Sequence, residues 1–474
     1  MTSPPPNRIT PARRAAYAAI RRTFEDGAYT DRALAAEAEG LDPRERGLAK
    51  RLAFGTVQRR LTLDHVVERL ARRPAGDLDP PVLAALRLGV YELAFSESAG
   101  HAAVDQAVEL TKAAGAGSAA GLVNAVLRRA SREAPALVAA LPDETPEEAA
   151  VRHSHPEWVA RTWWAALGPD DARALMAADN EPGETAVRVN TLRADPGEVA
   201  EQLHGRPADS AESGGSPRER RTTGEGLTPG DGGTPGDEGT PMAGAPHLPE
   251  GLLLTGAVDL ASTDLFAQGA ITPQSRASMA VARILDPQPG ERILDLCSAP
   301  GTKATHIAAL TSNQAQVVAI EVNPARAREL RENAQRQDAQ IQVVVGDARD
   351  DHGTGYDRVL VDPPCTGLGT LRSRPDLRWR ATEESAGELA ALQKEILANA
   401  ARSVRPGGTV VYSVCTINPT EGEDVVAARE DLMPDDLQTD HPLWKHPRVA
   451  NHLLPMPHRN ATDGFFIVRL RRPV

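Results

Sequence analysis

Two cysteines stand where the chain could aim a thiol at a substrate. Cys365 follows the rigid Asp-Pro-Pro turn of residues 362–364, and Cys415 follows the apolar run of residues 409–414. Since neither stretch of backbone can move easily, each side chain has a fixed direction. A thiolate is a strong nucleophile, although a single cysteine is more often a small buried hydrophobic residue. The two residues are therefore candidates for nucleophilic catalysis if they meet at one site.

A third cysteine lies in residues 291–306, which have the pattern of a nucleotide-binding loop. A short apolar strand ends at Leu296, a loop of small residues follows, and a helix-compatible segment comes next. Gly301 allows the backbone to approach a ligand at the start of that helix, where free amides attract polar groups. The loop holds one glycine where the dinucleotide fingerprint needs three. The residues predicted to contact a cofactor here are Asp295, Cys297, Ser298, Ala299, Pro300, Gly301, Thr302, Lys303 and Ala304.

Acidic residues follow the next strands at the same predicted edge. Glu321 ends the apolar run of residues 317–320, where it can accept hydrogen bonds from ribose hydroxyls, and Asp347 follows residues 341–345, within reach of an adenine amino group. Either carboxylate alone would be an ordinary helix cap or loop residue. Together with Asp295 they outline a site for an adenosine-containing ligand. The sequence has no phosphate-binding loop of the Walker type, which favours S-adenosylmethionine over ATP.

From residue 247 to residue 474 apolar strands alternate with helical segments. This pattern is typical of a doubly wound, mostly parallel α/β sheet of the Rossmann-like type. Every polar residue of interest follows a strand, and in open α/β sheets ligands bind at the carboxyl ends of the strands. The strands are expected at residues 293–296, 317–320, 341–345, 358–361, 409–414 and 465–470, with helices over 324–335 and through Leu392 and Ile396.

The first 140 residues predict a different fold. Apolar residues recur at helical spacing from Pro11 to about Arg132, which indicates an all-α domain of about six helices. Residues 141–205 predict a connecting α/β subdomain whose tryptophans we interpret as core, and residues 206–246, rich in Gly, Pro and Ser, a disordered insertion. The front domain also holds arginines that are either solvated helix faces or RNA contacts, namely Arg13, Arg14, Arg21, Arg22, Arg59, Arg60, Arg128 and Arg129.

Composition limits the possible functions. The 474 residues carry a net charge of −12, which argues against wholly electrostatic nucleic-acid binding, but basic residues are in excess within the first 140. Without a membrane-length apolar run or a signal-peptide core, we expect a cytoplasmic protein with no membrane partner. Three widely separated cysteines are too few for a disulfide framework or a zinc knuckle, so no metal is expected. We expect a monomer.

The two later cysteines and the cofactor site together predict a reaction. Carbon 5 of a pyrimidine is a poor nucleophile until a thiolate adds to carbon 6. A methyltransferase that acts on carbon therefore needs a cysteine, whereas one that acts on nitrogen does not. Cys297 lies inside the cofactor loop and is expected only to pack there.

Four motifs resemble those of the RNA cytosine-5 methyltransferases: Asp295-Leu-Cys-Ser-Ala-Pro-Gly-Thr-Lys, Asp362-Pro-Pro-Cys, Cys415 after the fifth strand, and Asp463-Gly-Phe-Phe. With a front domain that looks similar to NusB, the chain is identified as a member of the RsmB (Sun/Fmu) type, which modifies 16S ribosomal RNA. The resemblance implies an S-adenosylmethionine-dependent methyltransferase domain behind an all-α NusB-like RNA-binding domain. It implies that Cys415 attacks carbon 6, that Asp362 protonates or hydrogen-bonds ring nitrogen N3, and that Cys365 helps to remove the proton from carbon 5.

The sequence departs from the family pattern at a few positions. Thr302 replaces a glycine and Glu321 an aspartate, both beside the predicted cofactor, whereas the changes at residues 414 and 416 leave the thiol untouched. DNA cytosine-5 methyltransferases take their nucleophile from the Pro-Cys loop and lack a counterpart of Cys415, so the presence of both thiols favours RNA. Lys303 is expected in the active site near Asp362 or, alternatively, on the surface at a helix start.

Other functions stay open at this point. The same chemistry could act on transfer RNA or another RNA, and Arg372, Arg374 and Arg378 could contact phosphates or be solvated. In a different class, the chain could be a catalytically inactive NusB-like RNA-binding or antitermination factor. The presence of all four catalytic candidates argues against that reading: Cys415, Cys365, Asp362 and Lys303.

Overall fold

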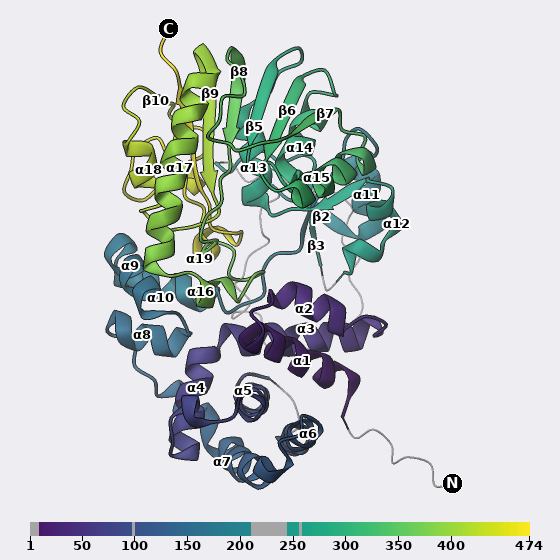
Figure 1. Cartoon of the computed structure of the whole chain (residues 1–474), viewed down its shortest axis with the longest axis vertical. Helices are drawn as coiled ribbons and strands as arrows, with labels where there is room; N and C mark the ends of the chain where they lie inside the picture. Colours follow the sequence, from purple (N-terminus) through teal and green to yellow (C-terminus); the bar gives the residue numbers. More distant parts are fainter. Residues whose placement is uncertain (1–8, 97–99, 210–243, 256–257) are drawn as a thin grey trace, which may run out of the picture.

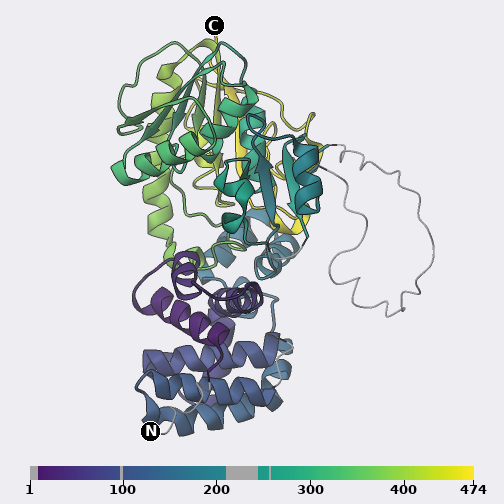
Figure 2. The same cartoon turned by 90° about the vertical axis from the view of Figure 1, so that its right-hand side faces the viewer.

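The computed structural model describes residues 9–96, 100–209, 244–255 and 258–474. An all-helical domain forms one end of the molecule, and an α/β domain built on a large sheet forms the other (Figure 1). The turned view shows residues 11–58 between the remaining helices and the α/β domain (Figure 2). The predicted fold class, a helical front domain and a Rossmann-like domain behind it, is confirmed.

The helical domain packs around one nearly all-apolar helix, α5 (Pro80–Phe95). Its buried residues run without a break from Ala84 to Glu92, so it packs on all sides. Gly89 leaves room for Leu127, whose Cδ1 would lie 2.6 Å from a Cβ at that position. The described part of this domain has seven α-helices where the sequence predicted about six. The others are α1 (Pro11–Glu25), α2 (Thr30–Glu37), α3 (Pro43–Gln58), α4 (Arg60–Ala71), α6 (Gly100–Ala113) and α7 (Ala120–Ala139).

Three short helices lead from the helical domain toward the sheets. They are α8 (Pro146–His153), α9 (Glu157–Leu167) and α10 (Pro169–Ala178). A capping box between Thr145 and Glu148 starts α8. Trp163 is fully buried in the core that these helices share with the large sheet, and Trp158 and Trp164 pack against the same core. The interpretation of the tryptophans as core residues is confirmed.

A small antiparallel sheet lies beside the large one, with strand order β2-β3-β1-β4. Its strand β1 lies in the connecting region of residues 141–205, for which the sequence predicted an α/β subdomain. The elements of this region are β1 (Ala186–Val189), α11 (Pro196–Leu203), β2 (Gly205–Pro207), β3 (Gly251–Leu254), α12 (Asp264–Ala267) and β4 (Ile271–Pro273).

Most of the predicted disordered insertion, residues 210–243, lies outside the described residues. The chain before and after it is attached to the same small sheet. Ala208 donates its backbone N–H to Gly251 O at 2.9 Å, and His247 Nδ1 lies 2.6 Å from Asp209 Oδ2. The chain thus leaves the sheet and returns to it at one place.

The large sheet has seven strands in the order β10-β11-β9-β8-β5-β6-β7. Its five central and right-hand strands in Figure 1, β5 to β9, are parallel, and β11 and β10 are antiparallel to them. Each predicted strand is present, whereas β10 was not predicted. The strands are β5 (Arg292–Leu296), β6 (Gln316–Glu321), β7 (Ile341–Val345), β8 (Tyr356–Val361), β9 (Val404–Val414), β10 (Met433–Pro434) and β11 (Phe466–Arg471).

Helices cover both faces of the large sheet. Leu294 and Val359 belong to the core that includes α17, whereas their neighbours Ile293 and Leu360 belong to the core that includes α13. Among the described helices none is both long and apolar enough to cross a membrane. The helices of this domain are α13 (Arg276–Leu285), α14 (Thr302–Leu310), α15 (Pro324–Arg336), α16 (Leu377–Arg380), α17 (Glu383–Ser403), α18 (Glu423–Ala427) and α19 (Pro457–Asn460).

Candidate active site

The structure brings the two later cysteines together. Cys365 lies in the loop after β8, and Cys415 directly follows β9, the parallel neighbour of β8. Because both strands end at the same edge, the Cys365 and Cys415 sulfur atoms lie 3.2 Å apart. At this distance one thiol can donate a hydrogen bond to the other.

The surroundings of Cys365 favour its protonated form. The hydrogen bond with Cys415 and burial raise the pKa of Cys365 well above its usual value. Cys365 is therefore the thiol that keeps its hydrogen.

Asp362 and Lys303 form an ion pair beside the thiols. Lys303 Nζ lies 2.6 Å from Asp362 Oδ2, and Ser413 donates its hydroxyl to Asp362 Oδ1 at 3.1 Å. Burial alone would lower the pKa of Lys303, but Asp362 and, more weakly, Cys415 raise it above its usual value. Lys303 also lies 5.4 Å from the ring centroid of Phe465. Because Lys303 is buried, its surface alternative is wrong.

Asp295, near the end of β5 and next to the cofactor loop, has one carboxylate oxygen without a hydrogen-bond partner. Asp295 Oδ2 accepts a hydrogen bond from the Ser298 hydroxyl at 2.7 Å, whereas the buried Oδ1 has no partner. Burial raises the pKa of Asp295 to about 7. Gly301 starts α14 with a φ of 98°, and a Cβ there would meet Leu330 Cδ1 at 2.3 Å. The close approach that the sequence predicted is thus partly a matter of packing against α15.

The other loop residues divide into packing and backbone positions. The side chains of Ala299 and Ala304 are buried in a small core with Ala319 and Leu330. Burial raises the pKa of Cys297, which therefore stays a thiol. Pro300 and Thr302 lie at the turn into α14, where Pro300 O accepts a hydrogen bond from Asn333 Nδ2 at 3.0 Å.

The carboxylates of Glu321 and Asp347 differ in the partners that they already have. Glu321 is buried at the end of β6, and its Oε1 accepts the backbone N–H of Asn323 at 2.9 Å. Asp347 is paired with Arg349, whose hydrogen bonds lower the pKa of Asp347 to about 2. Val322, the residue after Glu321, is 64% exposed.

Two of the three arginines predicted for the loop after Cys365 are held by other parts of the protein, and one of them, Arg378, lies in α16. Arg378 is fully buried and donates to Gln58 O, Ser154 O and Asp179 O at 3.0 to 3.2 Å. Its prediction as a phosphate contact or a solvated charge is wrong, because these carbonyls lie in other segments that cover it. Arg372 donates to Pro182 O, and Arg374 is exposed.

Most arginines at the start of the helical domain have local partners. Arg13 pairs with the buried Glu92, Arg21 with Glu25, and Arg22 with Glu37. Arg59 instead stacks on Phe95, and Arg60 on Phe24 and Trp379. Arg14 and Arg128 are exposed.

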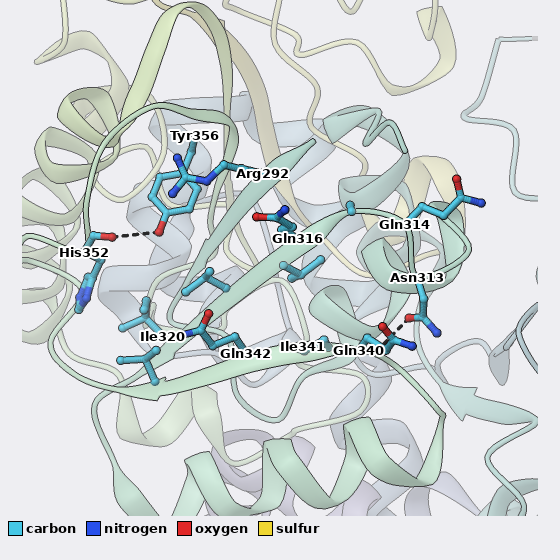
Figure 3. A pocket seen from close by; sticks show the side chains of 14 residues that line it. Arg292, Asn313, Gln314, Gln316, Ile320, Gln340, Ile341, Gln342, His352 and Tyr356 are labelled. Atoms are coloured by element: carbon cyan, nitrogen blue, oxygen red, sulfur yellow. Dashed lines mark hydrogen bonds between the residues drawn. The ribbon is translucent and has the colours of Figure 1, made fainter. Parts of the chain in front are cut away.

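A large cavity lies away from the thiols, on the sheet face over β6 and β7 (Figure 3). Its volume is about 920 Å³, and its lining includes Gln316, Gln342 and the stacked pair Arg292 and Tyr356. The face is open because the connection from β7 to β8 contains no helix. In the described residues no group of three or more His, Cys, Asp or Glu side chains could hold a metal ion.

Three buried residues near the thiols were missed from the sequence. Ser413 lies two residues before Cys415, so strand alternation could have placed it on the same face. Thr366 and Glu421 bond to each other behind the thiols. A glutamate in a loop gives no such signal, because a solvated carboxylate is the usual case.

A doubly wound sheet with paired thiols, acids and a cofactor loop at one edge defines the chain as a Rossmann-like methyltransferase joined to an all-helical domain. The family described as "16S rRNA methyltransferase RsmB/F" matches residues 282–471. The NusB family matches residues 10–132, and a ferredoxin-like domain of RsmF/B-like proteins matches residues 155–217.

Full-length relatives agree with these matches. The chain is 34% identical to "Probable ribosomal RNA small subunit methyltransferase B" of Synechocystis, over 97% of this chain and 99% of the relative. It is 31% identical to "Ribosomal RNA small subunit methyltransferase B" of Sodalis glossinidius, over 91% and 90%. The chain therefore belongs to the RsmB family of methyltransferases.

Solved structures share the fold. PH0851 superimposes with a TM-score of 0.76 at 24% identity, covering 99% of this chain and 100% of the other. NSun6 from Pyrococcus horikoshii, solved with the S-adenosylmethionine analogue SFG, has a TM-score of 0.53 at 24% identity, covering 67% and 98%.

Proposed function

We propose that this protein transfers a methyl group from S-adenosylmethionine to carbon 5 of a cytosine in 16S ribosomal RNA. The observation that carries the proposal is the pair of thiols 3.2 Å apart, beside Asp362 and Lys303 at the edge of the cofactor loop. A methyltransferase that acts on nitrogen or oxygen has no use for two thiols. The names of the relatives support the ribosomal substrate.

The residues present fit the cofactor. Asp295 Oδ1 is a buried acceptor without a partner, which the ammonium group of an amino acid would satisfy. Glu321 would hold the ribose hydroxyls, and Val322 offers apolar surface to the adenine. Asp347 would have to exchange part of its pairing with Arg349 for the adenine amino group. When bound, S-adenosylmethionine supplies an electrophilic methyl group.

Cys415 is the nucleophile in this proposal. Its sulfur bonds to carbon 6 of the cytosine, and the electron pair of the ring moves so that carbon 5 becomes nucleophilic. In the free enzyme the Cys365 sulfur lies 3.2 Å from the Cys415 sulfur, and the Lys303 ammonium is close enough to interact with Cys415.

Asp362 and Lys303 supply the proton that ring nitrogen N3 takes as the adduct forms. Lys303 Nζ donates a hydrogen bond to Asp362 Oδ2 at 2.6 Å, and Ser413 donates to the other carboxyl oxygen. A proton delivered to N3 neutralises the charge that nucleophilic addition places on the ring.

Cys365 completes the cycle by accepting the proton from carbon 5, and the electron pair of that C–H bond re-forms the ring double bond and expels the Cys415 sulfur from carbon 6. In the free enzyme its hydrogen bond with Cys415 is the largest cause of its raised pKa. Once Cys415 is bonded to carbon, that cause disappears and Cys365 ionises more easily. The pair can thus act in sequence, first one thiolate and then the other.

The test is methylation of RNA by the purified protein. We expect S-adenosylmethionine and 16S ribosomal RNA to yield 5-methylcytosine, identified by nucleoside mass spectrometry, and Cys415→Ala to yield none. Transfer RNA serves as the competing substrate. Methylation of transfer RNA alone would refute the ribosomal substrate, and cofactor binding without methylation of any RNA would refute the enzyme.

A further inference from the structure

A buried carboxylate lies behind the two thiols. Glu421, in the loop that follows Cys415, has no exposed surface. Its Oε1 accepts the backbone N–H of Thr366 at 2.8 Å, and its Oε2 accepts the Thr366 hydroxyl at 2.5 Å. Both oxygens are therefore bonded to the residue that directly follows Cys365.

Hydroxyl groups continue this link to the second thiol. A carboxylate only accepts, so the Thr366 hydroxyl donates to Glu421 and accepts from the Thr416 hydroxyl, 3.0 Å away. Thr416 Oγ1 in turn accepts the backbone N–H of Asn418 at 3.3 Å. The chain of hydrogen bonds thus joins the residues that directly follow Cys365 and Cys415.

Two further buried side chains fix Glu421 from the opposite side. Gln393 Nε2 donates to Glu421 Oε1 at 3.3 Å and to Pro364 O at 2.8 Å, and the Tyr412 hydroxyl donates to Glu421 O at 2.6 Å. Gln393 and Tyr412 have no exposed surface either. Burial raises the pKa of Glu421, and the hydrogen bonds from Thr366 oppose that shift. A buried carboxylate that accepts several hydrogen bonds is held in one position.

We propose that Glu421 is a positioning residue that sets the distance between the Cys365 and Cys415 sulfur atoms. The inference rests on the proposed function, in which Cys415 forms the adduct and Cys365 ends it. Cys415 directly follows β9, which pairs with β8 and β11, so the sheet fixes its place independently of the bonds that Glu421 makes to Thr366. The loop that carries Cys365 has Glu421 as its anchor at Thr366, and Gln393 holds the same loop at Pro364 O. Loss of the anchor displaces Cys365, so the adduct still forms but is released slowly.

Matched substitutions test whether Glu421 positions Cys365. Glu421→Gln places an amide hydrogen where Thr366 donates, and Thr366→Val removes the hydroxyl while Thr366→Ser keeps it. We expect Glu421→Gln and Thr366→Val to lower turnover about 10- to 100-fold, because a thiol misplaced by about 1 Å loses that much. A protein–RNA adduct should accumulate on denaturing gels. Thr366→Ser should turn over within about twofold of the unchanged protein.

A second readout needs no RNA. Diamide oxidises two adjacent thiols to a disulfide and takes up both hydrogens, so its rate with Cys365 and Cys415 reports their separation. We expect the unchanged protein and Thr366→Ser to couple their thiols quickly, and Glu421→Gln and Thr366→Val about tenfold more slowly. Affinity for S-adenosylhomocysteine should stay the same in all four.

Two results would overturn the positioning role. One is turnover of Glu421→Gln equal to that of the unchanged protein. The other is slower turnover with an unchanged rate of disulfide formation, which would reduce Glu421 to a stabilising residue. Fast thiol coupling in a protein that methylates no RNA would instead refute the proposed function and leave the positioning of the thiols supported.

Discussion

Cys365 and Cys415 are the same residue type in different surroundings. Cys365 is partly buried after the Asp-Pro-Pro turn and keeps its hydrogen, whereas Cys415 has Lys303 and the Cys365 thiol as neighbours. Under the proposed function this difference makes Cys415 the nucleophile and Cys365 the residue that ends the reaction. The roles can be separated by trapping the intermediate.

Cys365→Ala should trap a covalent protein–RNA adduct. Without a base to remove the proton from carbon 5, the bond between Cys415 and carbon 6 cannot be broken. The measurement is a band that survives denaturing electrophoresis and disappears after RNase treatment. Cys415→Ala, the control, should give neither adduct nor product. An adduct in Cys415→Ala and none in Cys365→Ala would reverse the roles.

From the raised pKa of Asp295 we expect cofactor affinity to depend on pH. The pKa of this carboxyl in the folded protein is about 7, so it is protonated below that pH and ionised above it. Because an ammonium group binds the ionised form, affinity for S-adenosylhomocysteine should rise about tenfold per pH unit below 7 and level off above it. Calorimetry between about pH 5.5 and 8.5 measures this.

Asp295→Asn should bind more weakly with no dependence on pH in that range. Asp347→Asn is the matched control, because the pKa of Asp347 is about 2 and the residue is ionised throughout. This variant should lose affinity but keep the slope. A slope that survives in Asp295→Asn would show that another group titrates.

At the scale of elements, the short helix α16 connects the active-site loop to the rest of the protein. Arg378 bonds to carbonyls in α3, in the turn after α8 and at the end of α10, and Trp379 Nε1 donates to Val57 O at 2.7 Å. Arg380 donates to Gly27 O and Ala28 O. The loop that begins at Cys365 therefore ends in a buried seam with the helical domain.

Arg378→Met should destabilise the protein by about 3 kcal/mol or more, because the buried acceptors around it lose their donor while the volume is kept. Urea unfolding measures the change in the free energy of unfolding. The exposed Arg374 provides the control, and Arg374→Met should stay within about 0.5 kcal/mol. Equal effects of the two substitutions would contradict the role of the seam.

At the scale of the whole molecule, this seam makes the helical and catalytic domains one unit. Figure 2 shows residues 11–58 lying directly against the catalytic domain, and Thr30 N bonds to Asp376 Oδ1 at 3.2 Å. Polar contacts that are buried between domains couple their unfolding. Ligand binding at the cofactor site should then change the stability of the helical domain.

We expect S-adenosylhomocysteine to raise the unfolding temperature of both domains together in a single calorimetric transition. A ligand that binds only the folded state, at a concentration of about 100 times its Kd, raises the free energy of unfolding by about 2.7 kcal/mol, and coupled domains share that stabilisation. Hydrogen exchange in α1 to α3 should slow on binding. In Arg378→Met the transition should split, and α1 to α3 should no longer respond. Two transitions in the unchanged protein would show independent domains.

The sequence by itself determined the elements and the order of the chemistry along the chain. Helical spacing before residue 140, alternating strands and helices after residue 247, and polar residues at strand ends are all local patterns, and each predicted strand is present. A turn, a strand or a cofactor loop is decided mainly by residues close in sequence. The motif around Asp295 and the Pro-Cys turn are readable for the same reason.

Only the tertiary structure decided which of these residues touch. The 3.2 Å between the Cys365 and Cys415 sulfurs follows from the pairing of β8 with β9, across 50 residues of chain. The sequence alone suggests that Arg378 is a surface charge, but in the structure it is enclosed by segments more than 190 residues away. The contact between Glu421 and Thr366 likewise appears only in the folded protein, where both residues are buried. Such contacts leave no periodic trace in the sequence, because they depend on how distant elements pack rather than on local preference.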